Sequence, residues 1–161
     1  MFEHFPVNRA DYDGPVLITG AGGCIGGWAL ALLARAGVPA VAFDLTEDKR
    51  RPKLLLPEAE LARVRWFTGD IADFDTVLRA VEASAATAIV HLAALQVPFC
   101  KADPVAGAKV NVVGTVNVLE AARKLGVKRV TYASAIAAYG AMDFPGAQGA
   151  GHSLADAALG G

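Results

Sequence analysis

The sequence is short of cysteine, of charge and of long apolar runs, and each shortage excludes a class of protein. Only two of the 161 residues are cysteines, Cys24 and Cys100, so no disulfide framework is expected and a reducing, cytoplasmic setting fits best. The net charge is −1, which gives no field that would attract nucleic acid or an acidic membrane. No apolar stretch approaches the length of a membrane span, and no signal peptide is evident at the N-terminus.

Metal-binding patterns are missing as well. The spacings of histidine and cysteine match no zinc site, so we expect no metal. Apolar residues, in contrast, make up 54% of a chain whose length suits one domain. Such a composition fits a sheet that is buried on both faces, because the strands of such a sheet read as unbroken apolar runs.

Strand and helix signals alternate along most of the chain. Short strands, the first two of them apolar runs, are predicted at residues 15–19, 39–44, 64–67, 88–92 and 128–134. Helices are predicted at residues 25–36, 73–85 and 103–126, and a charged loop with at most one helical turn at 46–57. This alternation predicts an α/β fold with a doubly wound parallel sheet of strand order 3-2-1-4-5. Ligands of such sheets bind beyond the carboxyl ends of the strands, where the strand order reverses.

The predicted helix at 103–126 has apolar residues at spacings of three and four that share one face: Val105, Ala108, Val112, Val116 and Leu119. The chain divides into a leader at residues 1–14, an α/β domain at 15–140 and a flexible Gly/Ala-rich tail at 141–161. That tail buries little apolar surface, so we expect the domain to be incomplete on its C-terminal side.

A glycine-rich segment joins the first predicted strand to the first helix. Its glycines Gly20, Gly23 and Gly26 are three residues apart. Pyrophosphate binding needs a tight turn, close approach of the backbone and a helix N-terminus that points at the anion, and glycine serves each need. A merely flexible turn is the alternative interpretation, and the strand before the loop and the helix after it count against that alternative.

An acidic residue, Asp44, ends the second predicted strand. A carboxylate there accepts hydrogen bonds from the adenosine ribose and repels a 2′-phosphate, which favours NAD over NADP. A basic run follows Asp44. In one interpretation it reaches the 2′-phosphate of a bound NADP; in the other it is a solvated loop. The run consists of Lys49, Arg50, Arg51 and Lys53.

Five stretches in order resemble the extended short-chain dehydrogenases/reductases, the NAD-dependent epimerase/dehydratase family. They are TGAGGCIG at 19–26, GDI at 69–71, HLAA at 91–94, NVVGTVNVLEA at 111–121 and YASAIAAYG at 132–140. The resemblance implies a Rossmann domain that binds NAD, in an oxidoreductase, epimerase or dehydratase acting on a sugar or nucleotide-sugar. It also implies the association of two copies into a homodimer.

The resemblance also implies roles for single residues. Asp44 would hold the ribose, and Asp70 with Ile71 the adenine. The pyrophosphate would lie along Gly20, Gly23, Cys24, Ile25 and Gly26, and the nicotinamide side along Leu92, Ala93 and Ala94. Family members use a tyrosine of a Tyr-x-x-x-Lys motif as acid/base, with the lysine lowering the pKa of the tyrosine.

The sequence departs from the family at the catalytic residues. No Tyr-x-x-x-Lys occurs, and Ala135 stands where the family has its catalytic Ser or Thr. Ser134 is a weak substitute, because strand alternation points it to the opposite face. We therefore expect the chain alone to be inactive. A non-catalytic NAD(P)-binding sensor or regulatory module is the alternative function, and a scaffold that binds no ligand is a third.

Three further residues lie near the predicted site. His91, at the end of the fourth strand, is expected to be buried and structural, because no carboxylate is placed beside it. Cys100 is expected in a loop on the substrate side, as an inert thiol. Asn111 is expected either to bond to the loop after the fourth strand or to brace the helix.

Overall fold

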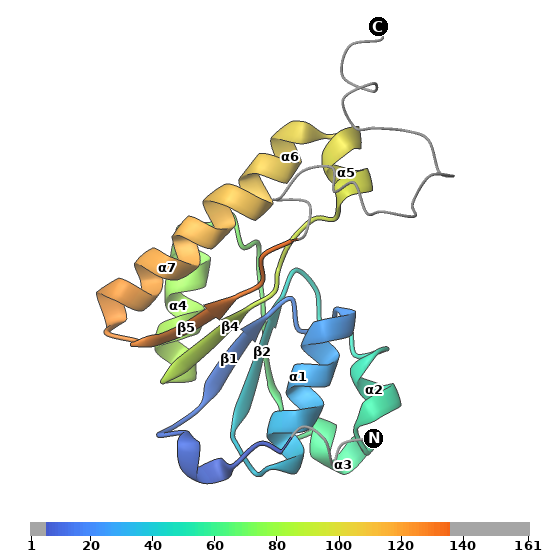
Figure 1. Cartoon of the computed structure of the whole chain (residues 1–161), viewed down its shortest axis with the longest axis vertical. Helices are drawn as coiled ribbons and strands as arrows, with labels where there is room; N and C mark the ends of the chain where they lie inside the picture. The colour runs from blue at the N-terminus through green and yellow to red at the C-terminus, as the bar shows by residue number, and fades with distance from the viewer. Residues whose placement is uncertain (1–5, 136–161) are drawn as a thin grey trace, which may run out of the picture.

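A five-stranded parallel sheet separates two layers of helices in the computed structural model, which describes residues 6–135 (Figure 1). The strand order is β3-β2-β1-β4-β5, so the predicted order is confirmed. At the centre of the sheet, Ile18 lies beside Ala42 on one side and Val90 on the other. The strands are β1 (Val16–Thr19), β2 (Ala40–Asp44), β3 (Arg65–Thr68), β4 (Ala88–His91) and β5 (Arg129–Tyr132).

One face of the sheet is covered by α1 (Cys24–Arg35), with α2 (Pro52–Leu55) and α3 (Glu58–Leu61) beside it (Figure 1). Leu30 of α1 is fully buried against Ile18 and its neighbours on β1 and β2. The segment 46–57, predicted as a charged loop with at most one helical turn, contains the single turn of α2.

The opposite face is covered by α4 (Phe74–Ser84) and α7 (Gly114–Leu125). Asp73 caps α4 as predicted, because its side chain accepts hydrogen bonds from the backbone of Asp75 and Thr76. The core on this side includes Leu17, Phe43 and Val118. The central strands β1, β2 and β4 lie between these two apolar layers, which explains their apolar sequences, whereas the edge strands β3 and β5 are more polar and more exposed.

A long helical rod runs from α6 (Pro104–Ala108) through a π-helical turn, η3 (Lys109–Val113), into α7 (Figure 1). The Asp103 side chain caps the rod by accepting from Ala106 N, and Gly126, with φ of +71°, ends it. The predicted start and end are therefore confirmed. A short helix, α5 (Val97–Ala102), precedes the rod and holds Cys100, which was wrongly expected in a loop.

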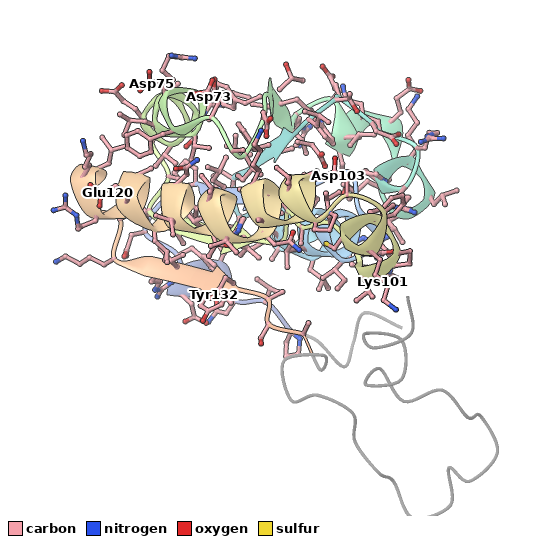
Figure 2. The ribbon with its side chains drawn as sticks, turned by 90° about the horizontal axis from the view of Figure 1, so that it is seen from above. Asp73, Asp75, Lys101, Asp103, Glu120 and Tyr132 are labelled. Atoms are coloured by element: carbon pink, nitrogen blue, oxygen red, sulfur yellow. The ribbon has the colours of Figure 1, made fainter. Side chains whose placement is uncertain are left out.

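The apolar stripe predicted on the rod faces solvent. Val105, Val112 and Val116 are 65%, 61% and 56% exposed, while Ala121 is fully buried. The buried face of α7 consists instead of Gly114, Asn117, Val118, Ala121 and Ala122, most of which are small. Figure 2 shows the rod, with Asp103 near one end and Glu120 near the other, between α4 and β5.

The segment before β1 packs on the α1 side of the sheet. It contains a 3-10 turn, η2 (Arg9–Asp11), and Val7 and Tyr12 contact the core there. Arg129 of β5 donates to Asp11 O at 2.7 Å and lies over the Tyr12 ring. At the other end, β5 stops at Tyr132, short of the predicted end at residue 134. The predicted tail, 141–161, lies outside the described residues.

Candidate functional site

A cleft of about 370 Å³ opens at the carboxyl ends of the strands. Segments that follow four different strands form it, so the cleft lies where parallel α/β sheets bind their ligands. The residues that line it are Gly20, Gly22, Gly23, Phe43, Asp44, Leu45, Thr46, Asp48, Arg51, Gly69, Asp70, Ile71, Leu92, Ala93, Ala94, Leu95 and Val110.

Gly20 makes the turn that leaves β1. Its φ is +70°, a left-handed value that other residues rarely adopt. A Cβ atom there would lie 2.7 Å from Ala93 N and 2.8 Å from Leu92 C, both backbone atoms. The turn and the close contact with the loop after β4 therefore both require glycine.

Helix α1 begins directly after the glycine loop, whose Gly20, Gly22 and Gly23 line the cleft. Its N-cap is Gly23, and no side chain hydrogen-bonds to the N-cap end of the helix. A Cβ on Gly26 would lie 2.2 Å from Gly20 O, so only glycine lets the first turn of α1 sit against the loop. Unpaired backbone amides and the helix dipole make this end suitable for an anion.

Asp44, at the end of β2, joins the glycine loop to its own strand. Its Oδ2 accepts from Gly22 N at 2.8 Å, and its Oδ1 accepts from Leu45 N at 2.8 Å. The half-buried carboxylate lines the cleft while it fixes the loop. Each carboxylate oxygen retains capacity to accept a further hydrogen bond, which a ribose hydroxyl can supply.

Two residues of the basic run after Asp44 form ion pairs, and a third lines the cleft. Lys49 pairs with Glu47, and Arg50 with Asp48 at 2.7 Å. The hydrogen bonds from Arg50 lower the pKa of Asp48 to about 2. Asp48 is therefore a second carboxylate on the wall of the cleft, while Arg51 is the member of the run that lines it.

Asp70 and Ile71 follow β3 on the same side of the cleft as Asp44. Asp70 is exposed and its Oδ1 accepts from Ala72 N at 2.8 Å, which shapes the turn. Ile71 is buried, and its carbonyl accepts from Asn117 Nδ2 of α7 at 3.0 Å. Helix α7 thus holds this part of the cleft wall in place.

The loop after β4 forms the opposite wall of the cleft. Asn111 clamps it, because Asn111 Oδ1 accepts from Leu95 N at 2.7 Å and Asn111 Nδ2 donates to Leu95 O at 3.0 Å. Of the two roles considered for Asn111, the bond to this loop is the one observed. The Cys100 thiol also donates to Leu95 O, at 3.3 Å.

His91 lies directly before this loop and is 4% exposed. Its Nδ1 is 2.6 Å from Thr19 Oγ1, and its Nε2 is 3.1 Å from Thr115 Oγ1. Burial lowers the pKa of His91 below its ordinary value of 6.5. The expectation of a buried, hydrogen-bonded histidine is confirmed, and its partners are two hydroxyl groups.

Most of the predicted site residues meet in the cleft. Eight of the eleven line it, and three do not: Cys24 and Ile25 are exposed at the start of α1, and Gly26 is buried beneath the loop. Sequence reasoning missed Gly22, Phe43, Leu45, Thr46, Asp48, Gly69, Leu95 and Val110 as lining residues. Gly22 and Gly69 adjoin predicted residues and were therefore within reach of the motifs, whereas Val110 enters from the distant rod.

Catalytic groups are sparse in the part of the chain that the structure covers. Ser134 is exposed beyond the end of β5, and Ala135 follows it. Between residues 6 and 135, no group of three His, Cys, Asp or Glu side chains is placed to hold a metal ion. Within the same range, no helix is long and apolar enough to cross a membrane.

The strand order, the glycine turn and the acid at the end of β2 define a Rossmann-type nucleotide-binding domain. Residues 16–153 match the NAD dependent epimerase/dehydratase family. The chain therefore belongs to this family, and the resemblance of its sequence motifs is confirmed.

Individual relatives agree with this assignment. A UDP-glucose 4-epimerase of Azospirillum brasilense is 32% identical over 127 residues, which cover 78% of this chain and 35% of the relative. The Thermus thermophilus UDP-glucose 4-epimerase, solved with NAD, superimposes with a TM-score of 0.62 and 33% identity over 72% of this chain and 36% of that one.

A second epimerase structure with NAD, from Brucella ovis, has a TM-score of 0.65 and 29% identity, and covers 80% of this chain and 38% of that one. The chain thus spans about a third of the length of its curated relatives, since the match covers 35% of the Azospirillum brasilense enzyme.

Proposed function

We propose that the cleft binds NAD and that the chain is the cofactor-binding part of an oxidoreductase or epimerase for sugars or nucleotide-sugars. The observation that carries this proposal is the arrangement of the Gly20 turn, the open N-terminus of α1 and the Asp44 carboxylate around one cleft. Two structures similar to this chain, both of UDP-glucose 4-epimerases, were solved with NAD.

The proposed placement follows the strand order. The adenosine lies toward β2 and β3, where Asp44 accepts from the ribose and Asp70 with Ile71 borders the adenine. The pyrophosphate lies against the glycine loop and the first amides of α1, including those of the exposed Cys24 and Ile25. The nicotinamide half crosses β1 and lies along Leu92, Ala93 and Ala94. The close approach of Gly20 to Ala93 keeps the crossing point narrow.

When bound, the nicotinamide would accept or donate the hydride. The described residues supply binding and orientation: backbone amides neutralise phosphate charge, carboxylates select the ribose, and an apolar wall excludes water. The Asp44 carboxylate, which carries no ion pair with Lys or Arg among the described residues, favours NAD because it would repel a 2′-phosphate. Arg51 is the competing feature, since it is placed to attract such a phosphate.

Fluorescence titration of the full chain with NADH and with NADPH tests the cofactor. We expect tighter binding of NADH. Asp44→Asn keeps the shape but replaces one acceptor oxygen by a donor, so the bonds from Gly22 N and Leu45 N cannot both persist. We expect NADH binding to weaken roughly tenfold or more, the value of a hydrogen bond to a charged group.

Asp75→Asn is the matched control, because it makes the same chemical change at an exposed position on α4. It should leave both titrations unchanged. Equal or tighter binding of NADPH by the unmodified chain would contradict the role given to Asp44. An unchanged signal at millimolar NADH would contradict cofactor binding itself.

A non-catalytic NAD-binding sensor or regulatory module is the second candidate. The presence of Ala135, where the family has its catalytic Ser or Thr, favours it. We expect the chain with NAD to convert no UDP-glucose to UDP-galactose in a coupled assay. Measurable turnover would exclude the sensor and would identify an acid/base other than the family's tyrosine.

We further propose that two copies associate through the rod and that the protein works in the cytoplasm, where its free thiols stay reduced. The exposed stripe of Val105, Val112, Val116 and Leu119 supports the association, because neighbouring exposed apolar side chains on one helix face favour contact with another apolar surface. Sedimentation of the unmodified chain and of Val116→Glu tests it. A monomer in both cases would contradict the homodimer.

A further inference from the structure

A chain of side-chain hydrogen bonds joins three elements that are distant in sequence. Thr19 Oγ1 at the end of β1 lies 2.6 Å from His91 Nδ1 at the end of β4. The Nε2 atom of His91 lies 3.1 Å from Thr115 Oγ1 on α7. Thr115 in turn donates to Asn111 O at 2.7 Å, across the π-helical turn. Thr19 and His91 are 1% and 4% exposed, so water does not compete for these groups.

The direction of each hydrogen bond in this series follows from counting donors and acceptors. Thr19 Oγ1 accepts from Ala93 N at 3.2 Å, and it shares the Leu92 N–H, at 3.1 Å, with the carbonyl oxygen of Thr19, which is also 3.1 Å away. With both amides directed at the oxygen, the hydroxyl proton points to His91 Nδ1, which accepts it. The ring proton is on Nε2 and is donated to Thr115, whose own proton goes to Asn111 O.

A neutral His91 with its proton on Nε2 gives every group in this series of hydrogen bonds a partner. A second proton, on Nδ1, would compete with the amides of Ala93 and Leu92 for the Thr19 hydroxyl oxygen. The Ala93 amide bonds to this hydroxyl and the Leu92 amide shares it with Thr19 O, so the state of His91 is linked to the position of the loop they begin.

That loop is the wall of the cleft opposite Asp44, and Leu92, Ala93, Ala94 and Leu95 all line the cleft. Its other end is held separately, by the clamp between Asn111 and Leu95. Asn111 of the π-helical turn bonds to one end of the loop, and Thr115 of α7 bonds to His91, which precedes the other end. The rod thus holds the wall of the cleft at two points.

We propose that Thr19, His91 and Thr115 are positioning residues that set the loop at 92–95 for the nicotinamide half of the cofactor. The inference rests on the proposed NAD binding and adds residues that lie behind the cleft. None of the three side chains needs to contact the cofactor. They act by fixing the backbone amides of Leu92 and Ala93, and through them the apolar wall.

The test compares two ligands and two variants of the full chain. Thr115→Val removes the hydroxyl and keeps the shape, whereas Thr115→Ser keeps the hydroxyl and serves as the matched control. ADP carries the adenosine and both phosphates, but it lacks the second nucleoside. Calorimetric titration measures the affinity of each variant for NADH and for ADP.

We expect Thr115→Val to bind NADH roughly tenfold more weakly, because it leaves the Nε2 proton of buried His91 without a partner. Its affinity for ADP should stay within about twofold of the unmodified chain, and Thr115→Ser should restore NADH binding. Unchanged NADH binding by Thr115→Val would overturn the inference. Equal weakening for NADH and ADP would also overturn it, because that result indicates a purely structural role.

These outcomes separate the inference from the proposed function. An unmodified chain that binds neither NADH nor ADP would refute cofactor binding, and the positioning role with it. A chain that binds both ligands while Thr115→Val behaves like it would refute the positioning role only.

A second measurement does not depend on the folding of any variant at Thr115. Nitrogen-15 NMR of the histidine rings in the unmodified chain reports which ring nitrogen carries the proton, and His91→Asn assigns the signal by removing it. We expect His91 to be neutral with the proton on Nε2. A proton on Nδ1 would overturn the direction of the hydrogen-bond chain and hence the inference.

Discussion

Gly20 and Gly37 provide a matched pair of substitutions that separates backbone strain from close packing at the cleft. Both have positive φ, +70° and +71°, so alanine meets the same left-handed strain at each. They differ in their surroundings. A Cβ on Gly37 would have no neighbour within 4 Å, whereas a Cβ on Gly20 would lie 2.7 Å from Ala93 N.

The magnitudes follow from these two terms. Gly37→Ala should lower the free energy of unfolding by about 1–2 kcal/mol, the strain of a left-handed alanine. Gly20→Ala adds overpacking against backbone atoms, typically about 1–3 kcal/mol, so its total should be about 2–5 kcal/mol. For a chain of this size, each 1 kcal/mol lowers Tm by about 2–4 °C.

Urea unfolding and NADH titration together test this reasoning. Gly37→Ala should unfold earlier but bind NADH normally, because it lies at the far end of α1 from the cleft. Gly20→Ala should be less stable still and should bind NADH at least about tenfold more weakly, since Leu92 and Ala93 must move to admit the new methyl group.

Two results would refute the argument. If both variants lowered the free energy of unfolding by the same amount, overpacking of the new methyl group at position 20 against Ala93 would add no destabilisation. If Gly20→Ala bound NADH as the unmodified chain does, the position of the loop after β4 would not matter for the cofactor.

The remaining predictions concern the buried polar groups around the cleft. Because burial lowers the pKa of His91 below 6.5, the folded chain resists a proton that the unfolded chain accepts. The free energy of unfolding should therefore be highest above pH 6.5 and fall as the pH drops toward the folded-state pKa of His91. Urea unfolding between about pH 5 and 7 should show this dependence on pH. The variant His91→Asn should lose it. Asn117→Ala leaves the Ile71 carbonyl without its donor at 3.0 Å and should lower the free energy of unfolding by about 1–3 kcal/mol, measured by the same method. Asn111→Leu removes both bonds to Leu95, so hydrogen exchange at the Leu95 amide should accelerate while exchange in β1 stays slow; unchanged exchange at Leu95 would contradict the clamp.

Much of the fold could be predicted because its signals are local. Short strands alternate with helical segments along the chain, and right-handed crossovers then leave few strand orders. The caps at Asp73 and Asp103 were predictable for the same reason, since a capping side chain bonds to amides two or three residues away. The glycine loop and Asp44 followed from their places beside the first two strands.

Other features depend on which faces of the helices pack against the sheet. The stripe from Val105 to Leu119 has the spacing of a buried face, yet it is exposed, because the rod packs on the sheet through smaller residues such as Ala121. Helical periodicity identifies a face but does not say what covers it. Helix α5 escaped prediction because its six residues are too few to show a period.

The sequence by itself determined the order of the elements, the parallel topology and the edge of the sheet at which a ligand binds, since each depends on short-range patterns. Only the tertiary structure decided that Thr19, His91 and Thr115 share one hydrogen-bond chain. The physical reason is the register of the sheet: β1 and β4 pair so that Thr19 lies beside His91, and the docking of α7 adds Thr115. No local pattern encodes that pairing, because it exists only after residues far apart in the chain have packed together.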